Sequence, residues 1–159
     1  QIVVGYLVGR NELDSVRARV WRSVLASIAV SESLNLLIYV FAAPIFGIFT
    51  QDPAIIALAR QIILVEFALE LGRSVNITMV RCLIAVGDVR FPVGAALFST
   101  WFIAVGLGWL LGVHFGMGLV GLWIGMAADE CFRGLLFVLR FRAGGWQRFA
   151  EKAQGAMHA

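Results

Sequence analysis

The sequence predicts an all-α membrane protein, a polytopic bundle of transmembrane helices. Of its 159 residues, 60% are hydrophobic and only 14% are charged, about half the charged share of an average soluble domain. The mean hydropathy is +0.87, and a soluble fold of this size would leave much of that apolar surface in water. The apolar residues also form runs of about 20 or more, the length that a helix needs to cross a bilayer.

Turn signals divide the chain into one partial span and four full spans. We expect the end of a truncated helix at residues 1–9, because this apolar run is too short to cross a bilayer and lacks the features of a signal peptide. Four transmembrane helices are expected within residues 10–141, at about 13–49, 53–86, 91–113 and 119–140. Residues 142–159 are polar, and we expect a solvated or interfacial cytoplasmic tail there. The chain is therefore interpreted as a fragment of a longer protein.

Three local signals set helix boundaries. Asp52 is a good N-cap and Pro53 suits the first helical turn, so a helix is expected to begin there. Gly87 is expected to end that helix. Pro44 is expected to kink the preceding helix, because proline has no backbone N–H to donate.

Positive charges mark alternate connections between the spans, as expected when they collect in cytoplasmic loops. The basic connections contain Arg10, Arg17, Arg19 and Arg22; Arg90; and Arg140, Arg142, Arg148 and Lys152. The other two connections, 47–53 and 112–118, contain no Lys or Arg. This alternation predicts a multi-pass protein whose C-terminus is cytoplasmic.

The helix expected at 53–86 carries charges at membrane depth, where each costs about 2.5–3.5 kcal/mol on insertion scales. Glu66, Glu70 and Arg73 lie on one side of this helix, and Asn76 borders that side. Such a side must face protein or a water-filled cavity. Two interpretations are open: Glu70 and Arg73 form a static ion pair, or the whole side lines a transport cavity and takes part in ion coupling.

Two other expected helices carry ionisable groups inside apolar runs. Glu32 and Asn35 share a face of the first full span, where a buried carboxyl must be protonated or find a partner. Glu32 is therefore a candidate proton carrier, and interhelical hydrogen bonding is the alternative. Asp129 and Arg133 lie four residues apart on the last span, a spacing that predicts an ion pair. We expect a structural or gating role for this pair, with direct substrate contact as the alternative.

Glycines recur at four-residue spacing in the last two spans. Gly108 and Gly112, and likewise Gly121 and Gly125, are four residues apart. This spacing lets membrane helices approach closely. It predicts tight packing and gives no information about a substrate.

No pattern in the sequence indicates an enzyme, a metal site or a nucleic-acid interface. His114 and His158 lack the paired spacing of metal ligands, and no nucleophile elbow or ATP-binding glycine–lysine motif is present. The 13 Lys and Arg residues, which leave a net charge of +3, follow the expected membrane topology. They do not suggest the basic face of a nucleic-acid-binding protein. We therefore expect no catalytic residue, no metal, no cofactor and no nucleic-acid partner.

Four stretches of sequence carry a family resemblance. They are QIVVGYLVGR at 1–10, LELGRSVN at 69–76, LIAVGDVRFP at 83–92 and GLVGLWIG at 118–125. The third resembles the L-x-A-x-G-D-x-R-F-P turn of the multidrug and toxic compound extrusion (MATE) transporters. The others resemble further stretches of that family, in the same order and at similar spacing.

The resemblance implies part of the C-terminal six-helix lobe of a twelve-helix transporter. It implies secondary active export of organic, often cationic, drugs or metabolites by antiport with protons or sodium ions, with no other cofactor. The implied partners are the lipid bilayer of the cell (inner) membrane, a small organic substrate and the N-terminal lobe of the same full-length chain. A lipid-linked oligosaccharide flippase of the same superfamily and a non-transporting membrane scaffold are the alternatives.

One position departs from the family pattern. Sodium-coupled members carry an acid on the tenth helix, and counting back from Gly87 places that position near Arg73. An arginine there argues against a simple copy of the sodium site and favours proton coupling. Glu66 and Glu70 are the nearest acids, and we expect them to take part in coupling or to line the cavity.

Overall fold

The computed structural model describes residues 2–10 and 13–149. Its α-helices are α1 (Ile2–Gly9), α2 (Leu13–Val40), α3 (Ala42–Gly47), α4 (Pro53–Ala85), α5 (Arg90–Ser99), α6 (Gly106–Trp109) and α7 (Gly118–Arg142). A π-helical stretch, η1 (Thr100–Val105), joins α5 to α6, and a second one, η2 (Leu110–His114), continues α6, so that the four form one continuous rod. No strand occurs among the described residues, and the predicted all-α class is confirmed.

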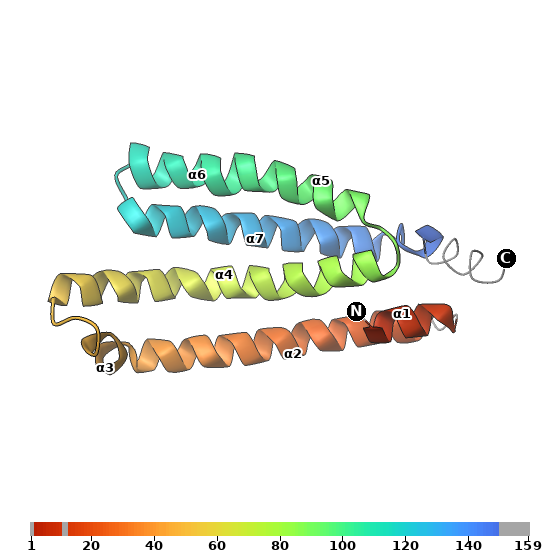
Figure 1. Cartoon of the computed structure of the whole chain (residues 1–159), viewed down its shortest axis with the longest axis horizontal. Coiled ribbons are helices and arrows are strands. Elements are labelled where there is room, and N and C mark those ends of the chain that lie inside the picture. The colour runs from red at the N-terminus through yellow and green to blue at the C-terminus, as the bar shows by residue number, and fades with distance from the viewer. Residues whose placement is uncertain (1, 11–12, 150–159) are drawn as a thin grey trace.

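The long helices lie side by side in a single layer, in the order α2, α4, α7 and the α5–η2 rod (Figure 1). α4 packs against α2, which runs antiparallel to it, and against α7, which runs parallel to it. The end of α1, the first turns of α2, the α4–α5 connection and the chain at and after the end of α7 lie at one end of the layer. We call this the basic end, because these segments carry Arg10, Arg17, Arg19, Arg22, Arg90, Arg140, Arg142 and Arg148.

Local signals define the ends of α4. The backbone N–H of Ala54 donates a 2.8 Å hydrogen bond to Oδ1 of Asp52, which is therefore the N-cap, and Pro53 is the first helical residue. After the last turn, Gly87 has a φ of 91°, a conformation that favours glycine. The chain then turns into α5.

The first full span is interrupted near Pro44. α2 ends at Val40 and α3 begins at Ala42, so the single helix expected over 13–49 is two helices. Pro44 has no N–H to donate to the carbonyl of Val40, and in a continuous helix its ring would clash with that carbonyl. As a result, α3 turns away from the axis of α2 (Figure 1).

The glycines that were predicted to allow close packing lie where α7 contacts the rod. Gly121 faces Gly112, and Gly125 faces Gly108. A Cβ on Gly121 would lie 2.5 Å from the backbone N of Gly112, and one on Gly125 would lie 2.6 Å from Cα of Gly108. The predicted tight packing of these helices is confirmed. The π-helical turns beside it were not predicted.

We expect Gly125→Ala to lower the free energy of unfolding by about 1–3 kcal/mol, because the added methyl overlaps backbone atoms rather than a flexible side chain. Gly94→Ala is the matched control: it lies within α5, and nothing lies within 4 Å of its added Cβ. There alanine is expected to be neutral or to stabilise the helix by up to about 1 kcal/mol. Denaturant titration of the full-length protein compares the two variants, and equal stabilities would contradict the close contact.

The buried core lies at the basic end, where α1, α2, α4 and α7 meet. Its largest member is Trp146, which is 0% exposed. The indole stacks on Phe141 with ring centroids 5.1 Å apart, and its Nε1–H donates a 3.0 Å hydrogen bond to the Phe141 carbonyl. The expectation of a solvated or interfacial tail over 142–159 is therefore wrong at Trp146, because Gly144, with a φ of 72°, turns the chain back onto the core. Residues 150–159 lie outside the described part of the chain.

Large apolar side chains cover the outside of the layer away from this core. Leu34 on α2 is 58% exposed and Trp101 on the rod is 68% exposed. Two helices, Ser15–Val40 and Arg90–His114, are long and apolar enough to cross a membrane. An apolar exterior of this extent suits contact with lipid or with further helices. That α4 and α7 also span the membrane remains a prediction.

Candidate functional site

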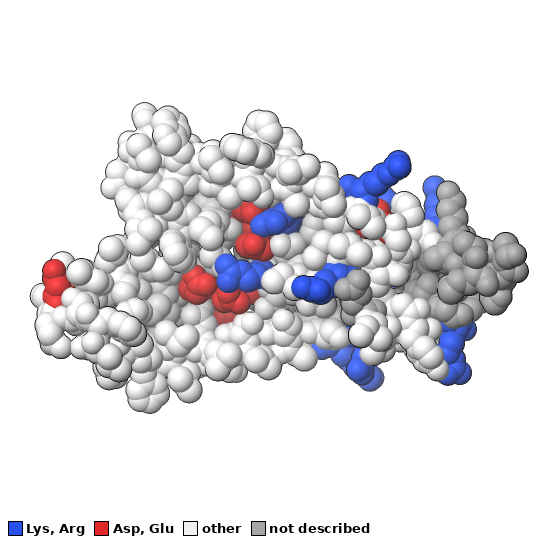
Figure 2. Space-filling view, in the orientation of Figure 1, with Lys and Arg blue, Asp and Glu red and all other residues white. Residues whose placement is uncertain are grey.

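Ionisable side chains gather midway along one face of the layer, over α4 and α7 (Figure 2). This charged face consists of Glu66, Glu70, Arg73 and Asn76 on α4 and of Asp129, Glu130 and Arg133 on α7. Most of the surface around it on the visible side is uncharged, up to the arginines of the basic end. The predicted α4 and α7 residues are therefore brought together in one place.

On α4, one guanidinium lies near two carboxylates. Nη1 of Arg73 is 2.5 Å from Oε1 of Glu70 and 3.9 Å from Oε1 of Glu66. Nε1–H of Trp123 on α7 donates a 2.6 Å hydrogen bond to Oε2 of Glu66. The predicted Glu70–Arg73 pair is present, and Glu66 connects it to α7.

On α7, one guanidinium again holds two carboxylates. Nη2 of Arg133 is 2.5 Å from Oδ2 of Asp129 and 3.0 Å from Oε1 of Glu130. Nδ2 of Asn76 on α4 donates a 2.6 Å hydrogen bond to Oε2 of Glu130. The hydroxyl of Ser99 on α5 donates to Oδ1 of Asp129, whose side chain is 5% exposed. The predicted Asp129–Arg133 pair is therefore the centre of a network that joins α7 to α4 and α5.

α2 adds a small cavity beside the charged face. The cavity has a volume of about 220 Å³ and is lined by Ser31, Leu34, Asn35 and Ile38 of α2 and by Glu66 and Glu70 of α4. Nearby, the hydroxyl of Ser74 donates a 3.3 Å hydrogen bond to that of Ser31. Oε1 of Glu32 and Nδ2 of Asn35 are buried and have no hydrogen-bond partner among the residues that the structure describes. Within this part of the chain, these two atoms make no interhelical hydrogen bond, and both roles predicted for Glu32 remain predictions.

A close backbone approach makes the polar contacts between α4 and α7 short. A Cβ on Gly72 would lie 2.6 Å from the backbone N of Cys131, and one on Gly134 would lie 3.2 Å from the carbonyl O of Gly72. Only glycine permits this spacing without a shift of the helices. Glu66 and Asn76, six residues to one side and four to the other, can then reach partners on α7 directly.

Sequence reasoning assigned no role to three residues of these networks, Glu130, Trp123 and Ser99. A signal for Trp123 exists, because it lies two helical turns before Glu130 and so shares the side of α7 that faces α4. Ser99 carries no comparable signal, because its contact with Asp129 depends on how the rod packs on α7.

Comparison with known proteins finds one matching family and relatives that cover most of this chain. The sequence pattern of the MatE family matches residues 1–110. The uncharacterized transporter YisQ of Bacillus subtilis (strain 168) is 38% identical over 92% of this chain and 32% of its own length. The probable multidrug resistance proteins NorM of Thermotoga maritima and Xanthomonas campestris pv. campestris are 27% and 33% identical, over 93% and 87% of this chain. The chain spans about a third of the length of these relatives. No solved structure matches it significantly.

Proposed function

The chain belongs to the MatE family, and we propose that it forms part of a secondary active transporter that exports small organic compounds. It is an all-α membrane protein of a transporter family rather than of an enzyme family. The relatives named as multidrug resistance proteins support drugs as the substrate class. Since the chain spans about a third of those relatives, we propose that an N-terminal lobe of the full-length protein completes the transport path.

The observation that carries this proposal is the one-sided placement of charge. Carboxylates and guanidinium groups meet at mid-length of α4 and α7 and remain visible from one side of the layer (Figure 2). Charged groups at membrane depth face protein or water rather than lipid. We infer that the charged face lines a water-filled path between this chain and the rest of the protein.

The charge balance of the α4 group suits cation exchange. Arginine remains protonated at any physiological pH, so Glu66, Glu70 and Arg73 together carry one net negative charge when both acids are ionised. A proton, a sodium ion or an organic cation can neutralise that charge, which is the property that an antiporter needs. We assign ion coupling or cavity lining to these three residues together with Asn76, and a proton as the favoured coupling ion.

The remaining polar residues are assigned by their contacts. Glu32 and Asn35 present unpartnered polar atoms close to the α2–α4 cavity, so we assign them to cation binding or proton transfer. Asp129 and Arg133 join three helices, so we assign them a structural or gating role. The basic end is proposed to face the cytoplasm of a cell with the protein in its inner membrane, because positive charge collects on that side.

Cysteine accessibility in the full-length protein tests the water-filled path. With Cys82 and Cys131 replaced by alanine, Glu70→Cys is expected to react with a membrane-impermeant thiol reagent at least about tenfold faster than Leu71→Cys, because thiolate forms only where water reaches the sulfur. Leu71 is the matched control, since it is the next residue of α4 and is 47% exposed on the outside of this layer.

The comparison also tests the scaffold alternative. In a scaffold, the charged groups would only hold helices together. A cysteine at position 70 would then react with the thiol reagent as slowly as one at position 71. Equal rates at the two positions, with the protein folded and inserted, would overturn the proposed path.

A further inference from the structure

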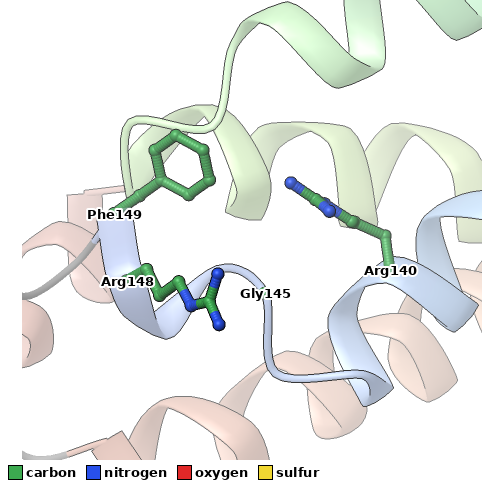
Figure 3. Close-up of a pocket in the computed structure, with 4 residues that line it drawn as sticks. All are labelled: Arg140, Gly145, Arg148 and Phe149. Atoms are coloured by element: carbon green, nitrogen blue, oxygen red, sulfur yellow. The ribbon is translucent and has the colours of Figure 1, made fainter.

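A pocket of about 250 Å³ lies at the basic end, where the chain turns back after α7. It is lined by Arg140, Gly145, Arg148 and Phe149 (Figure 3). This pocket lies at the end of the layer, whereas the charged face lies at mid-length (Figures 1 and 2). It is therefore a separate feature that the proposed transport function does not explain.

Two like charges converge on the pocket. The guanidinium groups of Arg140 and Arg148 point into the same space from opposite sides, with the ring of Phe149 beside them (Figure 3). Among the described residues, one carboxylate pairs with them: Oδ2 of Asp88 lies 3.0 Å from Nε of Arg140. Arg148 is exposed and makes no hydrogen bond or ion pair within the described chain. The pair therefore has one more positive charge than residues 2–10 and 13–149 neutralise.

Packing sets the position of the Arg140 guanidinium and of the turn that carries Arg148. Arg140 is held by Asp88, which is 1% exposed, and lies 4.9 Å from the ring centroid of Phe91. The turn that carries Arg148 is anchored by Trp146, buried against Phe141. Gly145 keeps the space open, because a Cβ there would lie 3.2 Å from Nη1 of Arg140. The Arg140 side of the pocket and the turn opposite it are therefore in place before any ligand binds, which lowers the entropic cost of binding.

We propose that this pocket binds a phosphate group, namely the headgroup phosphate of an anionic membrane lipid. Two planar guanidinium groups match the geometry of phosphate oxygens and donate charge-assisted hydrogen bonds to them. Basic pockets at the cytoplasmic ends of membrane helices meet a leaflet rich in anionic lipids. The guanidinium carbon of Arg142 lies 5.3 Å from the centre of the Trp21 ring on α2. Tryptophan is enriched at the level of the lipid headgroups, so this contact is consistent with a headgroup beside the pocket.

Native mass spectrometry of the delipidated full-length protein tests the site. Phosphatidylglycerol is titrated into the wild type, Arg148→Gln and Arg90→Gln. Arg90 is the matched control, because it is an exposed arginine of the same end that does not line the pocket. Arg148→Gln is expected to weaken the tightest lipid-binding event about tenfold, which corresponds to the free energy of a lost hydrogen bond to a charged group. Arg90→Gln is expected to leave the affinity of that event unchanged. Gly145→Val, which fills the pocket without changing charge, is expected to weaken it similarly.

The source of the phosphate is tested in the same samples. Phosphatidylcholine, whose headgroup carries a compensating positive charge, is expected to bind more weakly than phosphatidylglycerol at this site. Inorganic phosphate at millimolar concentration is expected to leave the bound lipid in place. Displacement of the lipid by inorganic phosphate would overturn the lipid assignment. Equal losses in Arg148→Gln and Arg90→Gln would overturn the site itself, since they would indicate only diffuse attraction to the basic end.

Discussion

Arg133→Met is expected to lower the free energy of unfolding by about 3–5 kcal/mol, the cost of removing one partner from a buried ion pair. The Arg133 guanidinium contacts both Asp129 and Glu130. Without it, the donors that the described residues leave to the two adjacent carboxylates are neutral, the hydroxyl of Ser99 and the amide of Asn76. Methionine is unbranched like arginine and keeps most of the apolar contacts of the side chain. The loss of unfolding free energy therefore reports the removal of the positive charge. Denaturant titration of the full-length protein in detergent gives the value.

Two further variants show whether the loss belongs to this network. Arg60→Met removes an exposed α4 guanidinium that forms no ion pair among the described residues, and it is expected to change stability by less than about 0.5 kcal/mol. Adding Asp129→Asn and Glu130→Gln to Arg133→Met removes the uncompensated charges and is expected to recover most of the loss. If Arg133→Met were as stable as Arg60→Met, the network would not contribute to folding.

The helix ends that the sequence predicted are those set by local chemistry. The cap at Asp52 and the turn at Gly87 depend on residues adjacent in the chain, so their signals are complete in the sequence. The break between Val40 and Ala42 was foreseen only as a kink, because proline specifies that a helix is disturbed and not whether it continues. The π-helical turns of the rod carry no charge or proline that announces them.

The candidate site shows the same division between local and distant contacts. The pairs Glu70–Arg73 and Asp129–Arg133 follow from spacing on one helix, and both are present. The hydrogen bond from Trp123 to Glu66 joins residues far apart in the chain and depends on the close approach of α4 and α7. A tail of polar and glycine residues likewise gave no sign that Trp146 would be buried, because a single aromatic residue forms no periodic pattern.

Two roles are open for Glu70 and Arg73, a static ion pair or a part of the transport path, and exchanging their charges separates the two. The double variant Glu70→Arg with Arg73→Glu keeps opposite charges three residues apart, so the pair and the fold are expected to survive. Export of a fluorescent organic cation is nevertheless expected to fall at least about tenfold. The exchange removes a carboxylate from the cavity lined by Asn35, and a lost charge-assisted contact of about 1.5–3 kcal/mol corresponds to that factor.

The control for this exchange is Asp52→Asn, which removes a carboxylate of the same helix outside the charged face. Asparagine caps a helix as well as aspartate does, so both stability and export are expected to stay at the wild-type level. Export is measured in cells with an imposed proton or sodium gradient, and the unfolding midpoint of each purified variant is measured beside it. Wild-type export by the exchanged protein would mean that the pair serves stability alone, and the coupling role would then fall to Glu66 or Glu32, whose carboxylates the exchange leaves in place.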